Sequence, residues 1–205
     1  VWDDAVREAY RPTLNTDWLY DTWGTGFKIN NLYDGTFVLD EHFNVLWGSF
    51  KSQPFQETNL DFFGEGLKAL IAQHARALSG DKNIYAGISK TRSGVAFVGI
   101  GLIRPMVGRL QVTDGTRRYL VITRHLNARI LSDLGATFQI DNLHFTPEKI
   151  NEMSMPLRSS AGELLGYLNW QARLPGAQAA RAASSDITQI VVLASALILL
   201  FILVS

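Results

Sequence analysis

The sequence contains no cysteine, and this absence excludes several kinds of chemistry at once. Disulfide bonds, thiolate catalysis and cysteine-ligated zinc all need a thiol. The absence is compatible with an oxidising compartment without requiring one.

Net charge is lacking too, because 19 lysines and arginines balance 19 aspartates and glutamates. Since no long run of either sign occurs, there is no electrostatic reason to expect nucleic acid as a partner. The chain also has no glycine-rich phosphate loop, GxSxG elbow or HExxH motif. Its histidines are far apart: His42, His74, His125 and His144. We therefore expect no catalytic function, no cofactor and no metal site in this chain.

The C-terminal stretch is almost devoid of polar side chains. Residues Ile187 to Val204 read ITQIVVLASALILLFILV, and at about 1.5 Å per residue a helix of this length reaches about 27 Å, close to the hydrocarbon thickness of a bilayer. The sequence predicts a truncated transmembrane helix over 187–205, in contact with membrane lipid. An alanine-rich juxtamembrane linker or helix precedes it over 175–186. Residues 1–174 carry charges and turn signals and have the size of one domain.

Helical spacing of apolar residues recurs in this domain. The pattern over 2–10 predicts an N-terminal helix, which Pro12 ends. An aromatic segment over 15–26 predicts a short second helix, and regular spacing from Leu60 to Leu78 predicts a longer one. A fourth helix is expected over 126–134, ended by the glycine that follows.

Strand patterns alternate with these helices. The sequences TFVLD from Thr36 and VLWGSF from Val45 read as a hairpin. The apolar run GVAFVGIGLI over 94–103 suits a central strand that is buried on both faces. Further strands are expected over 119–123, from ATFQID onward, over 153–158 and over 164–171. We therefore predict an α+β domain with an antiparallel sheet flanked by helices.

Three stretches together resemble the extracellular sensing domain of the fourth CHASE type, which occurs in bacterial and archaeal membrane receptors. They are WDDAV near the N-terminus, the region from Trp23 to Asp40 that runs into TFVLD, and GYLNWQARLPG after a strand and a glycine turn. The resemblance spans nearly the whole soluble part. It implies a PAS/Cache-like antiparallel sheet flanked by helices, with a long N-terminal helix and a ligand cavity.

The resemblance also implies a function. Residues 1–174 are then the extracytoplasmic sensor domain of a bacterial transmembrane signalling receptor, in the periplasm, and 187–205 anchor it in the inner (cell) membrane. The implied partners are an unknown small-molecule ligand and a second copy of the chain, because output modules are brought together across a symmetry axis. Those modules are GGDEF and EAL domains, which make and degrade cyclic di-GMP, or a histidine kinase. Their motifs are absent here, so this chain is not expected to be an enzyme.

Six of the candidate ligand-binding residues come from the N-terminal region. The carboxylates of Asp3 and Asp4, beside Trp2, could recognise an amine or a cation, or could simply interact with the dipole of their helix. The other three are aromatic and could line a pocket or form core: Trp18, Tyr20 and Trp23.

Three more candidates lie on the predicted central strand. Phe97 and Gly99, like Gly101, share one face, where missing side chains leave either a cavity floor or a seat for a closely packed helix. Arg104 at the strand end, together with Arg124, could bind a carboxylate or a phosphate. Alternatively, these arginines pair with Asp40 or Asp141.

Two other function classes stay open. A membrane-tethered envelope enzyme predicts perturbed acid and base groups in one cleft, for example around Asp40, His42 and Arg104. A protein-binding scaffold module predicts an exposed apolar patch in place of a closed cavity.

Overall fold

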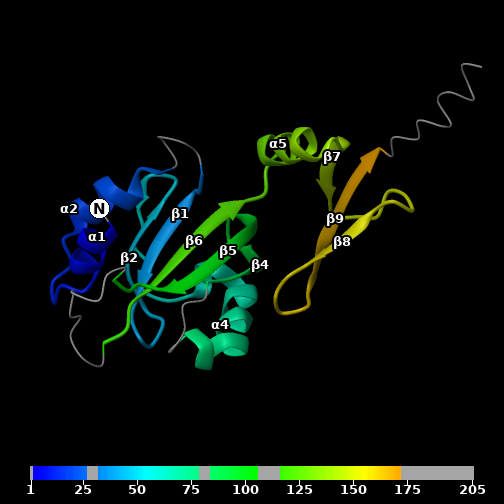
Figure 1. The fold of residues 1–205 in the computed structure, drawn as a ribbon. Coiled ribbons are helices and arrows are strands. Elements are labelled where there is room, and N and C mark those ends of the chain that lie inside the picture. The colour runs from blue at the N-terminus through cyan, green and yellow to red at the C-terminus, as the bar shows by residue number, and fades with distance from the viewer. Residues whose placement is uncertain (1, 27–31, 79–83, 106–115, 172–205) are drawn as a thin grey trace, which may run out of the picture.

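Antiparallel strand pairing organises most of the chain into two sheets. The computed structural model describes residues 2–26, 32–78, 84–105 and 116–171. Six strands form one sheet in the order β3-β2-β1-β6-β5-β4, and three form a second sheet in the order β7-β9-β8 (Figure 1). The predicted α+β class with antiparallel pairing is confirmed.

The larger sheet contains the strands β1 (Gly35–Leu39), β2 (Val45–Phe50), β3 (Gln53–Pro54), β4 (Ile84–Thr91), β5 (Gly94–Leu102) and β6 (Tyr119–His125). The smaller sheet contains β7 (Asp141–Thr146), β8 (Met155–Arg158) and β9 (Leu164–Gln171). The helices are α1 (Trp2–Ala9), α2 (Thr16–Leu19), the π-helix η1 (Tyr20–Gly24), the 3-10 helix η2 (Asp61–Phe63), α4 (Gly64–Leu78) and α5 (Ala128–Phe138).

One face of the six-stranded sheet packs against α4 and builds the main core. Val98 and Ile100 of β5 lie there with Leu67 and other apolar residues of α4. Phe37 of β1 is fully buried, and its ring meets that of Phe63 edge to face at 4.7 Å between centroids. Burial of such large rings is among the strongest contributions to folding stability.

The N-terminal helices cover part of the opposite face. Val6 and other apolar residues of α1 are buried with Val38 of β1 and Trp47 of β2. Two side-chain hydrogen bonds fix α1 to the end of β5: Trp2 Nε1 donates to the Arg104 carbonyl at 2.8 Å, and the Tyr10 hydroxyl donates to the Ile103 carbonyl at 2.8 Å. The expected long N-terminal helix has only eight residues in α1, which ends before Pro12.

The two faces of β5 differ, and the prediction that both are buried is wrong. Alternate residues such as Val98 point into the α4 core, whereas Phe97 on the other face is 40% exposed. No described helix or strand covers this end of the sheet face. The sequence prediction also missed β4, which pairs along its whole length with β5.

The boundary between α5 and β7 differs from the prediction. Gly135 lies inside the helix, and ATF belongs to the helix, because α5 continues to a left-handed cap at Gln139 with φ 55°. A Cβ on Gly135 would lie 2.8 Å from the Ile140 carbonyl oxygen, so the glycine permits close packing of the following chain instead of ending the helix.

The predicted juxtamembrane and transmembrane segments, 175–186 and 187–205, lie outside the described residues. Among those that are described, no helix has the length and apolar character needed to cross a bilayer.

Replacing Phe37 with alanine should lower the free energy of unfolding by about 3–5 kcal/mol, because it removes a fully enclosed ring and leaves a cavity. The matched control is Phe97→Ala, two strands away on the open face, which should cost less than about 1 kcal/mol. Urea denaturation of both variants measures the difference. Equal costs would contradict the one-sided core.

Candidate functional site

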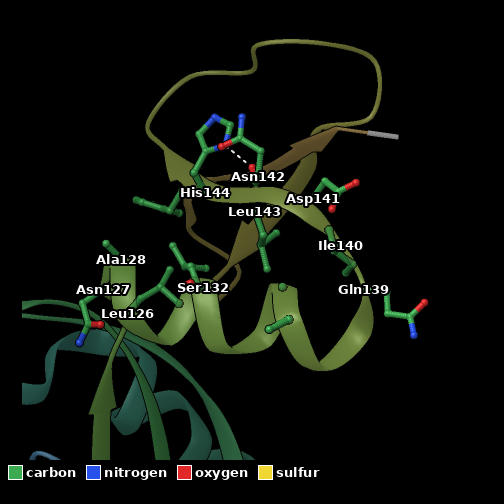
Figure 2. A pocket seen from close by; sticks show the side chains of 14 residues that line it. Leu126, Asn127, Ala128, Ser132, Gln139, Ile140, Asp141, Asn142, Leu143 and His144 are labelled. Atoms are coloured by element: carbon green, nitrogen blue, oxygen red, sulfur yellow. Dashed lines mark hydrogen bonds between the residues drawn. The ribbon is translucent and has the colours of Figure 1, made fainter. Parts of the chain in front are cut away.

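A pocket of about 700 Å³ lies between α5 and β7 (Figure 2). Its apolar lining includes Leu126, Leu131, Leu143 and Phe145. Its polar lining includes Asn127, Ser132, Gln139, Asp141 and His144. Small-molecule sites in proteins combine this range of volume with mixed lining of this kind.

Local sequence features shape both walls of the pocket. The Asn127 side chain caps α5 by accepting a hydrogen bond from the Ile130 backbone N–H at 3.0 Å. On the other wall, the pairing of β7 with β9 shifts register between Asp141 and His144, and Asn142 takes a positive φ of 54°. As a result Leu143 points toward α5, while the side chains of Asn142 and His144 lie on the far side of β7 (Figure 2).

The pocket's charge favours some ligands over others. Among the described residues that line it, Asp141 is the one carboxylate and none is a lysine or an arginine. The His144 ring points away from α5, and its Nδ1 donates to the Asn142 carbonyl oxygen at 2.7 Å, so this ring adds no charge between α5 and β7. A neutral or cationic ligand is therefore favoured over an anion, which would have no fixed cation as partner.

The pocket is next to the strand that leads out of the described structure. β7, which forms one wall, pairs with β9 over Asp141–Thr146, and β9 ends at Gln171. Any ligand that changes the spacing of α5 and β7 acts on the neighbour of this last described strand.

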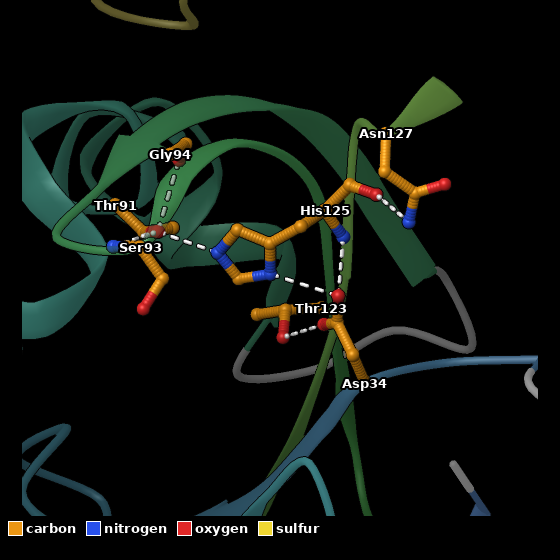
Figure 3. A network of polar contacts seen from close by, with 7 residues as sticks. All are labelled: Asp34, Thr91, Ser93, Gly94, Thr123, His125 and Asn127. Atoms are coloured by element: carbon orange, nitrogen blue, oxygen red, sulfur yellow. Dashed lines mark hydrogen bonds and ion pairs between the residues drawn. The ribbon is translucent and has the colours of Figure 1, made fainter. Parts of the chain in front are cut away.

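A buried polar network supports the chain just before the pocket (Figure 3). Asp34, which precedes β1, accepts hydrogen bonds from the His125 backbone N–H at 2.7 Å, from His125 Nδ1 at 2.9 Å and from the Thr123 hydroxyl at 3.0 Å. His125 Nε2 lies 2.6 Å from the Thr91 hydroxyl at the end of β4. The network thus joins three strands at the point where β6 leads into Leu126 and α5.

Burial and hydrogen bonding act oppositely on the Asp34 carboxyl. Burial alone would raise its pKa, but the hydrogen bonds from His125 and Thr123 outweigh this, so the pKa lies below its ordinary value. The His125 ring is enclosed by Phe50 and Phe62, with centroids 5.2 and 6.3 Å away.

An acid, an imidazole and a hydroxyl in line could suggest nucleophilic catalysis. Asp34, Thr91 and His125 are however each at most 7% exposed, and none of them lines the pocket. The Thr91 hydroxyl is also engaged with the Gly94 carbonyl at 2.9 Å. We therefore interpret the network as a structural brace that positions the start of α5. No sequence pattern predicts this network, because its members are far apart along the chain.

The six N-terminal candidate residues are placed away from the pocket. Trp2 and Trp23 pack together with ring centroids 6.1 Å apart, and Trp2 bonds to the Arg104 backbone. Trp18 and Tyr20 pack against the same buried cluster. Asp3 and Asp4 lie in the first turn of α1, where Asp4 pairs with Arg7 at 3.3 Å.

The candidates on β5 are not joined into an anion site. Phe97 and Gly99 lie on the open sheet face, and a Cβ on Gly99 would meet nothing closer than 3.9 Å. Arg124 is opposite Phe97, whereas Arg104 follows the far end of β5, so the two arginines do not form one anion clamp.

The remaining sequence candidates have other roles. Asp40 accepts hydrogen bonds from the backbone N–H groups of His42 and Asn44, both at 2.8 Å, and so caps the turn between β1 and β2. Within the described part of the chain, no three histidine or acidic side chains are grouped as a metal site would require.

No protein-family model matches this chain, and a search of curated proteins found no significant relative. Function is therefore inferred from the geometry of the chain itself.

Replacing Asp34 with asparagine should cost about 2–3 kcal/mol of unfolding free energy at neutral pH, since charge-assisted hydrogen bonds in a buried site are lost. Because folding lowers the pKa of Asp34, its stabilisation is present above the unfolded pKa of about 3.9 and is lost as pH falls through the folded pKa. The difference between wild type and variant should therefore shrink in acid.

Urea denaturation across the acid range tests this expectation, with Asp40→Asn as the control. Asparagine keeps the oxygen that accepts the turn's backbone hydrogen bonds, so the control should cost less than about 1 kcal/mol. A wild-type advantage over Asp34→Asn that stays constant down to the lowest pH would contradict the role of the ionised carboxylate.

Proposed function

We propose that this chain is the extracytoplasmic ligand-sensing domain of a bacterial transmembrane signalling receptor. The observation that carries the proposal is the α5/β7 pocket, which shares β7 with the strand pair that leads to Gln171. The predicted membrane segment follows in sequence. A ligand in this pocket is well placed to act on the connection to the membrane.

The fold is compatible with this proposal. An antiparallel sheet with α4 on one face and the N-terminal helices over part of the other is compatible with the PAS/Cache-like architecture that the resemblance implies. α1 and β9 lie at opposite ends of the molecule (Figure 1). We therefore propose that transmission from the pocket runs through β7 and β9.

Sensing in such a domain requires that the ligand bind two conformations of the domain with different affinities. A ligand that binds one arrangement of α5 and β7 better than another shifts the population toward it, by no more than its differential binding free energy. In the whole receptor we propose that this shift reaches a GGDEF, EAL or histidine kinase module across the inner membrane, in a homodimer. The domain itself would then be a non-enzymatic input.

An exposed apolar patch supports a second candidate function, protein binding. Ile84, Phe97 and Ile122 are exposed together on the uncovered face of β4, β5 and β6, at 79%, 40% and 37%. Exposed apolar patches often mark protein-binding surfaces. A scaffold module that recruits an envelope protein would use this face and leave the pocket empty.

A thermal-shift screen of the detergent-solubilised chain against neutral, cationic and anionic metabolites tests the sensor proposal. A ligand at about 100 times its Kd stabilises by about 2.7 kcal/mol, and we expect neutral or cationic compounds among those that raise the Tm. Ser132→Trp, which fills the pocket, should abolish the shift.

The matched control is Thr137→Trp, on the same helix but outside the pocket lining, which should keep the shift. Flat responses to every compound, or stabilisation that survives Ser132→Trp, would contradict sensing at this site. Loss of stabilisation in both variants would indicate damage to α5 in general and would also count against it.

A further inference from the structure

The turn between β8 and β9, residues 159–163, is docked on the edge of the six-stranded sheet. The Ser160 backbone N–H donates to the Ile88 carbonyl at 2.8 Å, and the Ile88 N–H donates to the Ser160 hydroxyl at 3.2 Å. Ile88 belongs to β4, the edge strand. One residue of the small sheet thus satisfies both backbone groups of an edge residue, which would otherwise be open to solvent or to another chain.

Other contacts hold the same turn in place. On α4, Gln73 Nε2 donates to the Ser160 carbonyl at 3.2 Å. Inside the turn, the Ser159 N–H donates to the Glu163 carbonyl at 2.8 Å, and the Glu163 N–H donates to the Ser159 hydroxyl at 3.1 Å. Lys90 Nζ and Glu163 Oε1 are 3.8 Å apart, but both side chains are largely exposed, so their ion pair adds little stability to the contact.

Close approach at this point requires a glycine. A Cβ on Gly87 would lie 2.1 Å from the Ser160 hydroxyl oxygen and 3.4 Å from Ser160 Cβ. A Cβ at position 87 would clash with the Ser160 hydroxyl where it lies, so either the hydroxyl gives up the hydrogen bond from the Ile88 N–H or the turn moves. Gly87 of β4 therefore leaves the space that the Ser160 side chain occupies.

We propose that the Ser160 turn is a releasable latch that couples β9 to the six-stranded sheet and so regulates the pocket. In the part of the chain that the structure describes, the small sheet is attached at two places: through α5, which forms one wall of the pocket, and through the latch. A change in the spacing of α5 and β7 moves the small sheet about its covalent link and displaces Ser160 from β4. The signalling role of this coupling rests on the proposed function.

The latch is suited to release because few bonds hold it. Among the described residues it consists of the two Ser160–Ile88 hydrogen bonds, the Gln73 bond and the exposed Lys90–Glu163 ion pair, each of which has a modest net free energy in water. A ligand's differential affinity for two arrangements can shift an equilibrium of this size.

Amide hydrogen exchange of the full chain, without any ligand, tests the latch. Gly87→Ala should speed exchange at Ile88 and along β9 by about tenfold or more, because the turn is displaced. It should also change exchange at residues 140–145 in the pocket wall. Gly99→Ala is the matched control, since its Cβ meets nothing nearer than 3.9 Å, and should leave all three regions as in wild type.

A disulfide provides the opposite perturbation. In this cysteine-free chain, the Gly87→Cys and Ser160→Cys pair can form a single disulfide, because the two Cβ positions are 3.4 Å apart. Oxidation should slow exchange in β9 and in residues 140–145, and reduction should reverse this. If Gly87→Ala fails to fold, Ser160→Ala gives the comparison, since it removes the hydroxyl that accepts from the Ile88 N–H and adds no atom at position 87.

Exchange rates of β9 and the pocket wall that are equal in the released, locked and wild-type chains would overturn the latch. Because no ligand enters the experiment, this failure is distinct from failure of the metabolite screen, which bears on the proposed function. A response confined to Ile88 would likewise overturn the coupling, since it would show a local contact only.

Discussion

The attachment of the three-stranded sheet is the constraint on which the rest of this structure depends. Leu157 is the one apolar side chain, glycine aside, that is buried in the described strands β7, β8 and β9, so this sheet has little core of its own. The six-stranded sheet, in contrast, has a complete core against α4. The small sheet therefore takes its position from α5 and from the Ser160 turn on β4.

The polar network at Asp34 fits this arrangement. It fixes the end of β6 through His125, two residues before the Asn127 cap of α5. The N-terminal end of α5 is thus held in place, while the C-terminal part of α5 and β7 line the pocket. A rigid support beside a weakly held element allows a small molecule to move one against the other.

Periodicity in the sequence predicted the elements with the strongest local signals. The α4 helix and the β1–β2 hairpin follow their apolar spacing. What failed depends on tertiary context: β4 was missed, and β5 was assigned two buried faces, because the sequence cannot show which half of a sheet face a helix will cover. The pocket was also missed, because it forms where α5 continues past Gly135 and packs against β7. Three of the nine candidate residues were chosen for aromatic density, and these belong to or pack against the second core, as Trp2 does: Trp18, Tyr20 and Trp23.

The central claim is that a ligand between α5 and β7 acts on β9. Hydrogen exchange along the whole chain, with and without a stabilising compound from the metabolite screen, tests it most directly. The account predicts altered protection in two regions together, the pocket walls over 126–145 and the strand over 164–171. Altered protection confined to α1 and the open face of β5, with β9 unchanged, would contradict it.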